Sequence, residues 1–389
     1  MAGQQIGRLG KVFVKDAATY GVAPTLVATD AFKHLDMGFR KTNNRSNSLE
    51  RRGTPGLENR FSRHIEAGFD LRSAYLSPSG TLKTVPNARV FLKHAFGTER
   101  IGALSTTVAS GPTTTGATLT SGTGLAQGDC VLINCTGGSF PGAYARVLKS
   151  VAGAVVTWGP ALPQAPAVAD TVKDGVTYRL ANTLPAAGVH MAKYLPDVSW
   201  ELFGAVIEKL GLQFDGNDEC KFSASGPAMN AAQTAQAQPG AFTAVGSPVT
   251  GISGYLYRDN TAIKATKFDF EINNMAKLIN DSFGTDRAED HFRNGRRDVT
   301  ISLEQRLLST SDFYDLAEDA TDFVFAAQAG TVEGRILFVY CPRVELDIPD
   351  IADPDGEIIP SYKGVCKETA AGLDGASTGG NDELILGLL

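Results

Sequence analysis

Two stretches of the chain, 64–76 and 297–308, alternate apolar and polar residues at every second position. This alternation is typical of a strand that buries one face. Each strand precedes a stretch, 85–97 or 309–320, in which apolar residues recur three and four positions apart. That spacing predicts an amphipathic helix, and Gly97 suits the C-terminal end of the first one. The pattern therefore predicts two strand–helix units.

The same order of elements occurs in both halves of the chain. In each half a short apolar stretch precedes a polar, charged loop, and the loop precedes the alternating strand and its helix. The two loops cover 41–63 and 274–296. We therefore predict an internal duplication, because a repeated order of elements indicates repeated units. Chance similarity between two α+β halves is the alternative.

Two further stretches differ from the rest in composition. Residues 101–183 are rich in Thr, Gly, Ala and Val and predict a small all-β insertion of short strands. Residues 222–257 contain no Asp, Glu, Lys or Arg, and their small and polar residues predict a linker or extended arm. The predicted fold class is mainly β, of the α+β kind. The predicted domains are 1–100 together with 184–226, the insertion 101–183, the linker 227–260 and a second domain 261–389.

Charge and cysteine content narrow the classes of function. The 389 residues include 36 basic and 42 acidic ones, and the net charge of −6 argues against a protein that grips nucleic acid along one basic face. Five scattered cysteines indicate a reducing compartment rather than a disulfide scaffold. No run of 18 apolar residues occurs, and the opening residues lack the apolar core of a signal peptide. We expect a soluble chain, made in the cytoplasm.

No motif predicts catalysis. The nucleophile-elbow, zinc-protease, P-loop and paired-cysteine motifs do not occur, and the five histidines lie in unrelated contexts. The run 347–357 contains five acidic residues and partly resembles a calcium loop. Pro349, Pro354 and the strand patterns on both sides instead favour a solvated hairpin tip. We expect no enzyme activity, no cofactor and no metal.

Several stretches together resemble a major tail tube protein of a long-tailed, siphovirus-like bacteriophage. The stretches are GRLGKVFVKDAATYGVAPT, VSWELFGAVIEKLGLQFDGNDECKFSASGPAM, GRILFVYCPRVELDIPDI and the final NDELILGLL. The order of the elements carries more weight than any one motif. The resemblance covers nearly all of the chain except 101–183, which is similar to a decoration inserted after the first helix.

The resemblance implies a fold and a function. It implies β-sandwich-like domains whose sheets join across subunits into a closed barrel, in rings that stack into a tube with sixfold or pseudo-sixfold symmetry. With two tube domains in each chain, a ring of three chains is favoured and a ring of six is the alternative. The implied partners are further copies of the chain and the tail terminator, tape-measure and baseplate proteins. Double-stranded DNA would pass through without specific binding.

Residues for the tube lumen can be named under this resemblance. The non-core strand faces carry Arg72, Lys267 and Arg306 together with a larger number of acidic residues. The lumen candidates are the acidic ones, Glu66, Asp70, Asp269, Glu271 and Glu304. A mildly acidic wall would let DNA slide, because a wall rich in Lys and Arg would bind its phosphates. Ordinary solvated strand faces are the alternative.

The two charged loops suggest how rings stack. Loop 41–63 has six basic and two acidic residues, a net charge of +4, whereas 281–290 has four acidic residues and one basic one, a net charge of −3. Opposite charges on successive rings would favour one docking register. The stacking candidates are Lys41, Arg45, Arg51, Arg52, Arg60, Asp281, Asp286, Glu289 and Asp290. A flexible, solvated loop is the alternative, and a nucleic-acid-binding arm would lack aromatic residues for stacking bases.

The sequence therefore predicts a structural virion protein of the phage tail, which forms a conduit for DNA. A baseplate or tail-fibre component, whose insertion 101–183 binds the host surface, is the second possibility. A hydrolase with an unrecognised site is the third.

Overall fold

The computed structural model describes residues 10–47, 60–195, 198–234, 237–243, 246–282, 284–306, 312–349, 359–369, 372–373 and 380–389. Side chains are described for all of these except 45–47, 60–63 and 312. Strands dominate the described chain, which has two α-helices, so the prediction of a mainly β fold is confirmed. The helices are α1 (Arg89–Phe96) and α2 (Asp312–Glu318), with 3-10 turns at η2 (Ala28–Asp30) and η3 (Gly251–Ser253).

Most strands belong to one large antiparallel sheet, and six form a separate barrel. The sheet strands before α1 are β1 (Lys11–Asp16), β2 (Ala31–Phe32), β3 (Asp36–Asn47) and β4 (Arg60–Tyr75). Those between the helices are β5 (Gly97–Ile101), β12 (Val176–Leu180), β13 (Val189–Tyr194), β14 (Ser199–Ala205), β15 (Lys209–Asp215), β16 (Lys221–Thr234), β17 (Tyr255–Arg258), β18 (Thr261–Ala262), β19 (Lys267–Asn273) and β22 (Asp298–Glu304). Those after α2 are β23 (Phe323–Ala329), β24 (Leu337–Leu346), β25 (Ser361–Cys366) and β26 (Ile385–Leu388).

The centre of the sheet is a run of eight strands that both halves of the chain build. Its order is β3–β4–β16–β15–β19–β22–β25–β24. The first four strands lie within residues 36–234 and the last four within residues 267–366. These two parts of the chain are the two halves of the predicted duplication. The two groups also agree in their order along the sequence. In each group the first strand of the sheet comes first in the sequence, the second comes next, then the fourth and finally the third. The two halves therefore share one sheet, and β15 and β19 join them.

Shorter strands extend this run on both sides. In the first half β13 pairs with β14, and β1 pairs with both β13 and β2. In the second half β23 pairs with β24, and β17 pairs with both β23 and β18. Strand β26 links β24 to β12, which in turn pairs with β5.

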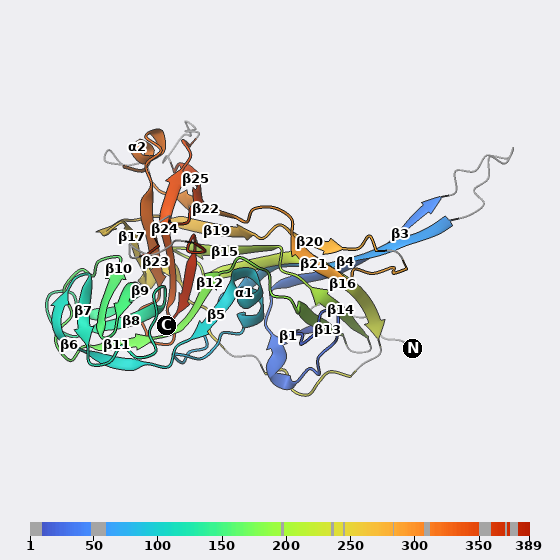
Figure 1. Ribbon diagram of the computed structural model, residues 1–389, viewed down its shortest axis with the longest axis horizontal. Helices are drawn as coiled ribbons and strands as arrows, with labels where there is room; N and C mark the ends of the chain where they lie inside the picture. The colour runs from blue at the N-terminus through green and yellow to red at the C-terminus, as the bar shows by residue number, and fades with distance from the viewer. Residues whose placement is uncertain are drawn as a thin grey trace.

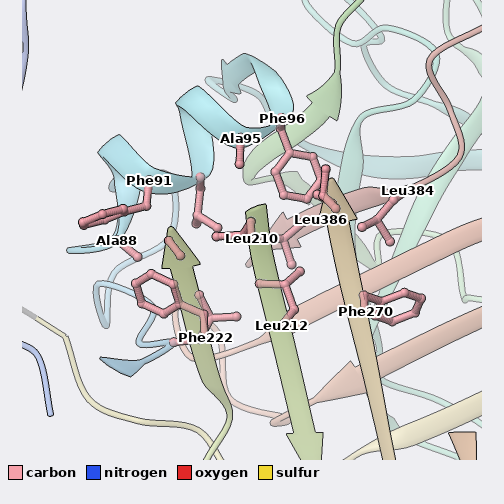
Figure 2. Close-up of a cluster of buried hydrophobic side chains, with 14 of the residues drawn as sticks. Ala88, Phe91, Ala95, Phe96, Leu210, Leu212, Phe222, Phe270, Leu384 and Leu386 are labelled. Atoms are coloured by element: carbon pink, nitrogen blue, oxygen red, sulfur yellow. The ribbon is translucent and has the colours of Figure 1, made fainter. Parts of the chain in front are cut away.

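Helix α1 covers one face of the sheet and helps to form its core. Figure 2 shows Phe91, Ala95 and Phe96 of the helix pointing toward apolar side chains of the strands, among them Leu210 and Leu212. These side chains are almost completely buried. The helix ends at Gly97, whose φ of 93° suits a residue without a Cβ. The predicted helix and its apolar stripe are therefore present.

The barrel is a small closed unit at the end of the molecule opposite the β3–β4 hairpin (Figure 1). Its strands are β6 (Ser105–Thr113), β7 (Gly116–Leu119), β8 (Cys130–Cys135), β9 (Gly142–Ala152), β10 (Val155–Gly159) and β11 (Thr171–Asp174). Trp158 lies at the centre of its core, with 1% exposed. The all-β unit thus falls within the predicted 101–183, but β12 of that stretch belongs to the large sheet.

The barrel is packed firmly against the large sheet. Buried Gln328 on β23 accepts a hydrogen bond from Ala145 N–H at 2.8 Å and donates one to the carbonyl of Ala143 at 2.9 Å. A shared apolar cluster joins the two, with Leu132 and Val147 from the barrel and Phe338 from β24. The barrel therefore has a fixed orientation on the sheet.

Three expected irregular segments contain regular structure instead. The predicted linker 227–260 is wrong over its first part, because β16 continues to Thr234 with alternate residues buried. Small uncharged residues suit this strand because it is enclosed between β4 on one side and β14 and β15 on the other. The predicted loop 41–63 is strand at both ends, in β3 and β4. The predicted loop 274–296 contains the hairpin of β20 (Ala276–Ile279) and β21 (Asp290–Arg293).

Candidate assembly surfaces

The face of the central sheet opposite the core is polar and hollowed. Strands β4, β16, β15, β19, β22 and β25 surround a hollow of about 560 Å³. The charged residues that line it are Arg72, Lys221, Asp269, Glu271, Asp347 and Lys363. The face arises from the alternation of each strand, which buries every second side chain and exposes the ones between.

All five lumen candidates lie on this polar face. Glu66 and Asp70 alternate with the buried residues of β4, and Asp70 pairs in register with Ser225 of β16. Ser225 faces Lys209 of β15, and Lys209 faces Asn273, so the face continues onto β19. The other three candidates, on β19 and β22, are Asp269, Glu271 and Glu304. Whether this face lines a tube stays a prediction.

The face is less acidic than the sequence analysis predicted. Lysines from three strands that were not assigned to it, Lys209, Lys221 and Lys363, also lie on it. Lys209 pairs with Glu271 at 3.2 Å, and Lys267 pairs with Asp269 at 2.9 Å. The wall is therefore a mixture of closely spaced opposite charges. The alternation in 209–215 and 361–366 was the signal that could have found these lysines.

Arginine completes the charge pattern at one border of the hollow. Arg72 bridges two acids, Asp36 at 3.1 Å and Asp70 at 3.2 Å. These pairs are exposed, so each contributes at most about 1 kcal/mol to stability. Burial raises the pKa of Asp269, and its bond to Lys267 only partly opposes this effect. Opposite charges on this face are thus paired around Arg72, between Lys209 and Glu271 and between Lys267 and Asp269.

Three of the five predicted basic stacking residues lie on strands β3 and β4, which project beyond the body of the molecule (Figure 1). Lys41 lies within β3, where its ammonium donates to the carbonyl of Ala231 at 2.5 Å, so it is held by its own chain. Arg45 and Arg60 lie in the two strands, but their side chains are outside the described part. Arg51 and Arg52 lie wholly outside it.

The predicted acidic stacking residues lie at the tip of the β20–β21 hairpin. Their side chains are exposed, and the residues are Asp281, Asp286, Glu289 and Asp290. The carbonyl of Asp286 accepts a hydrogen bond from Ile65 N–H of β4 at 2.8 Å. The acidic segment therefore contacts the base of the projecting hairpin within the same chain. Its outward side chains remain available to a neighbour.

Other potential sites can be assessed from the same description. All five cysteines are buried and none forms a disulfide bond. Among the described residues, no three His, Cys, Asp or Glu side chains are placed to hold a metal ion. Most of the acidic run 347–357 lies outside the description. No described helix has the length and apolar character needed to span a membrane.

Comparison with known proteins gives one result. The sequence model of the family described as phage tail tube protein matches residues 7–372, which is nearly the whole chain. None of the curated proteins matches the chain. The family match agrees with the strand-rich fold. The chain therefore belongs to the phage tail tube protein family.

Proposed function

We propose that this chain is the repeating subunit of a phage tail tube and that its polar sheet face lines the tube lumen. The observation that carries the proposal is the continuous polar face across six strands contributed by both halves of the chain. A tube wall must be one continuous surface, and a sheet that closes on itself provides one without open edges.

We also infer that the two groups of four strands are copies of one tube domain. Their strands follow the same order, and a close backbone contact recurs in both. A Cβ added at Gly226 would lie 1.9 Å from the carbonyl oxygen of Val206, and one added at Gly364 would lie 2.3 Å from that of Glu345. In both copies this glycine lies on the third strand of the group. Its contact comes from the segment between β14 and β15 in the first group and from β24 in the second.

Two domains in each chain favour a ring of three chains. Three chains would supply six copies of the domain, and β15–β19 would provide every second junction between domains. A ring of six chains would supply twelve copies of the domain, which is twice the number that a pseudo-sixfold ring requires. The ring would close by joining the first strand of one chain to the last group of strands of the next.

The charge pattern of the lumen face supports passage of DNA without capture. The affinity of a protein for the phosphate backbone grows with the number of cations that neutralise phosphates and release counterions. On this face Lys209, Lys267 and Arg72 each already have a carboxylate within 3.2 Å. Their charge is partly compensated before DNA arrives, so the wall offers few strong phosphate sites.

The projecting β3–β4 hairpin is the element best placed to join successive rings. Its strands extend the sheet beyond the body of the molecule (Figure 1), and its basic residues would meet acidic residues of the next ring. The exposed acidic segment 281–290 is the complementary surface that we propose. Repeated around a ring, such contacts would set the angle between rings even though each pair is weak.

Negative-stain electron microscopy of the purified, concentrated protein tests this function. Rings or hollow tubes with threefold or pseudo-sixfold end views are the expected result, and the mass of one ring distinguishes three chains from six. If the protein stays in a small closed oligomer even after tail initiator proteins are added, the tube function is refuted. In that case a baseplate or fibre component, with the barrel as its binding part, becomes the better explanation.

A further inference from the structure

A second hollow, of about 550 Å³, borders the connection between β21 and β22, the end of β25 and the residues just before β26. Basic side chains dominate its lining, and they are Arg293, Arg296, Arg297, Arg343 and Lys367. The acidic side chains of the lining are Glu368 and Glu383. Five positive and two negative charges give the lining a net charge of +3, in a protein whose net charge is −6. We call this site the basic hollow.

The outer basic side chains differ in how far they are already paired. Arg343 and Lys367 both pair with Asp322, at 2.5 and 3.2 Å. Arg296 is the most exposed of them, with 83% of its side chain in solvent, and its Nε lies 3.8 Å from Asp298. An exposed pair of this kind is weak. Arg296 can therefore turn toward a ligand in the hollow at little cost.

The inner basic side chains, Arg293 and Arg297, share too few acceptors. Both donate to the backbone carbonyl of Ala181, Arg297 at 2.8 Å and Arg293 through two nitrogens at 3.3 Å each. A carbonyl oxygen has two lone pairs, so it cannot fully satisfy three donors. The Nε atoms of both guanidinium groups are buried and have no hydrogen-bond partner among the described residues. The two arginines thus present more N–H donors than the surrounding protein supplies acceptors.

Charge is out of balance at the same two arginines. Glu383 pairs with Arg297 through both carboxylate oxygens, at 2.6 and 2.7 Å. Arg293 instead donates to neutral groups, the carbonyl of Asn182 at 2.9 Å and the amide oxygen of Asn274 at 3.2 Å. Burial lowers the pKa of Arg293, the positive charge of Arg297 lowers it further, and Glu383 opposes this only in part. Among the described residues, one carboxylate therefore serves two guanidinium groups.

We propose that the basic hollow binds an oxyanion, a phosphate or carboxylate group, through Arg293 and Arg297, with Arg296 as a third donor. An oxyanion supplies what the site lacks, because it carries negative charge and several acceptor lone pairs in a small volume. Planar guanidinium groups bind such anions through paired hydrogen bonds. The same chemistry is available from a free phosphate ion and from an acidic side chain of a neighbouring chain. The inference goes beyond the proposed function, because it does not depend on which face lines the tube.

Binding of inorganic phosphate by the unassembled full-length protein tests the site. Phosphate should raise the midpoint of thermal unfolding in a saturable way relative to sodium chloride at equal ionic strength and pH, because a ligand of the folded state stabilises it. Arg293→Gln should weaken the binding measured by isothermal titration calorimetry about tenfold or more, since a charged donor is lost. Arg296→Gln should weaken it as well, and its exposed side chain makes a folding defect unlikely to interfere. Arg72→Gln is the matched control, because this exposed arginine lies between two acids elsewhere on the molecule, and it should bind phosphate as the parent does.

Assembled tubes distinguish the two sources of the oxyanion. If a free phosphate ion is the ligand, equilibrium dialysis with radiolabelled phosphate should show equal binding per chain in tubes and in the unassembled protein. If an acidic side chain of a neighbouring chain fills the hollow, tubes should bind no phosphate and Arg293→Gln should lower their yield. Either result supports the oxyanion site. Absence of phosphate binding by the unassembled protein, or equal binding by the parent, Arg293→Gln and Arg296→Gln, overturns the proposal and leaves the tube function standing.

Discussion

The repeated glycine contact gives a quantitative test of the fold. Replacing Gly226 by alanine would place a Cβ 1.9 Å from the carbonyl oxygen of Val206, whereas Cβ atoms essentially never approach closer than 3.0 Å. The obstacle is backbone, so the two segments must separate by about 1 Å at this contact. Two hydrogen bonds hold the contact, from Val206 N–H to Pro227 at 2.9 Å and from Glu208 N–H to Ser225 at 3.0 Å.

The expected cost follows from these two effects. Overpacking of a tight site costs about 1–3 kcal/mol, and each weakened backbone hydrogen bond costs about 1 kcal/mol. We expect Gly226→Ala to lower the free energy of unfolding by about 3 kcal/mol. Gly364→Ala should have a similar effect, because its Cβ would lie 2.3 Å from the carbonyl oxygen of Glu345.

Urea unfolding of the unassembled protein, followed by circular dichroism, measures this cost through the midpoint and slope of the transition. Gly38→Ala is the matched control, since it is also a strand glycine but its added Cβ would meet nothing closer than the carbonyl oxygen of Asp70 at 3.9 Å. Its stability should stay within about 0.5 kcal/mol of the parent protein. If Gly226→Ala unfolds at the midpoint of the Gly38→Ala control, the contact is not built as described and the match between the two halves loses its main support.

Three further predictions concern the barrel, acid stability and the lumen. Gln328→Leu should destabilise the barrel by about 1–3 kcal/mol, because the buried N–H of Ala145 loses its hydrogen-bond acceptor. Thermal unfolding followed by the fluorescence of buried Trp158 measures this loss, and an unchanged transition would contradict the role of Gln328 in docking the barrel. Burial disfavours the charged form of Asp16, but hydrogen bonds from His94 and Lys93 outweigh burial and lower its pKa. A lowered pKa stabilises the folded protein at a pH above the ordinary carboxyl pKa of about 4, and this contribution is lost as the pH falls below that value. Asp16→Asn should therefore flatten the acid side of a curve of stability against pH. An unaltered curve would refute the role of Asp16 in acid stability. Tubes that carry Asp269→Lys and Glu271→Lys should retain short duplex DNA at low salt and release it at high salt; equal release by variant and parent tubes would argue against a lumen position.

The sequence predicted the elements of the fold better than their connections. The alternation in 64–76 and 297–308 and the helix at 85–97 are present because local periodicity reports one buried face. The segment 227–234 was misassigned because small uncharged residues suit both a linker and a strand enclosed between neighbours. Only the sheet order distinguishes these two cases.

The polar face was predicted only in part for a similar reason. Glu66, Asp70, Asp269, Glu271 and Glu304 were placed from strands with strong alternation. The lysines of β15, β16 and β25 join them only because non-local pairing brings those strands between and beside the others. Charge balance on a sheet face depends on which strands are neighbours, and single-strand periodicity contains no information about that.

The arrangement of strand edges explains why this fold suits the proposed assembly. The junction of β15 with β19 joins the two groups of strands by seven consecutive antiparallel pairs, so each group already has one neighbour inside the chain. Among the described residues β3 pairs with β4 alone, and the open edge of a strand exposes backbone donors and acceptors that a further strand can bind. Under the proposed ring such an edge would be covered by the next chain, because a sheet that closes on itself has no open edges.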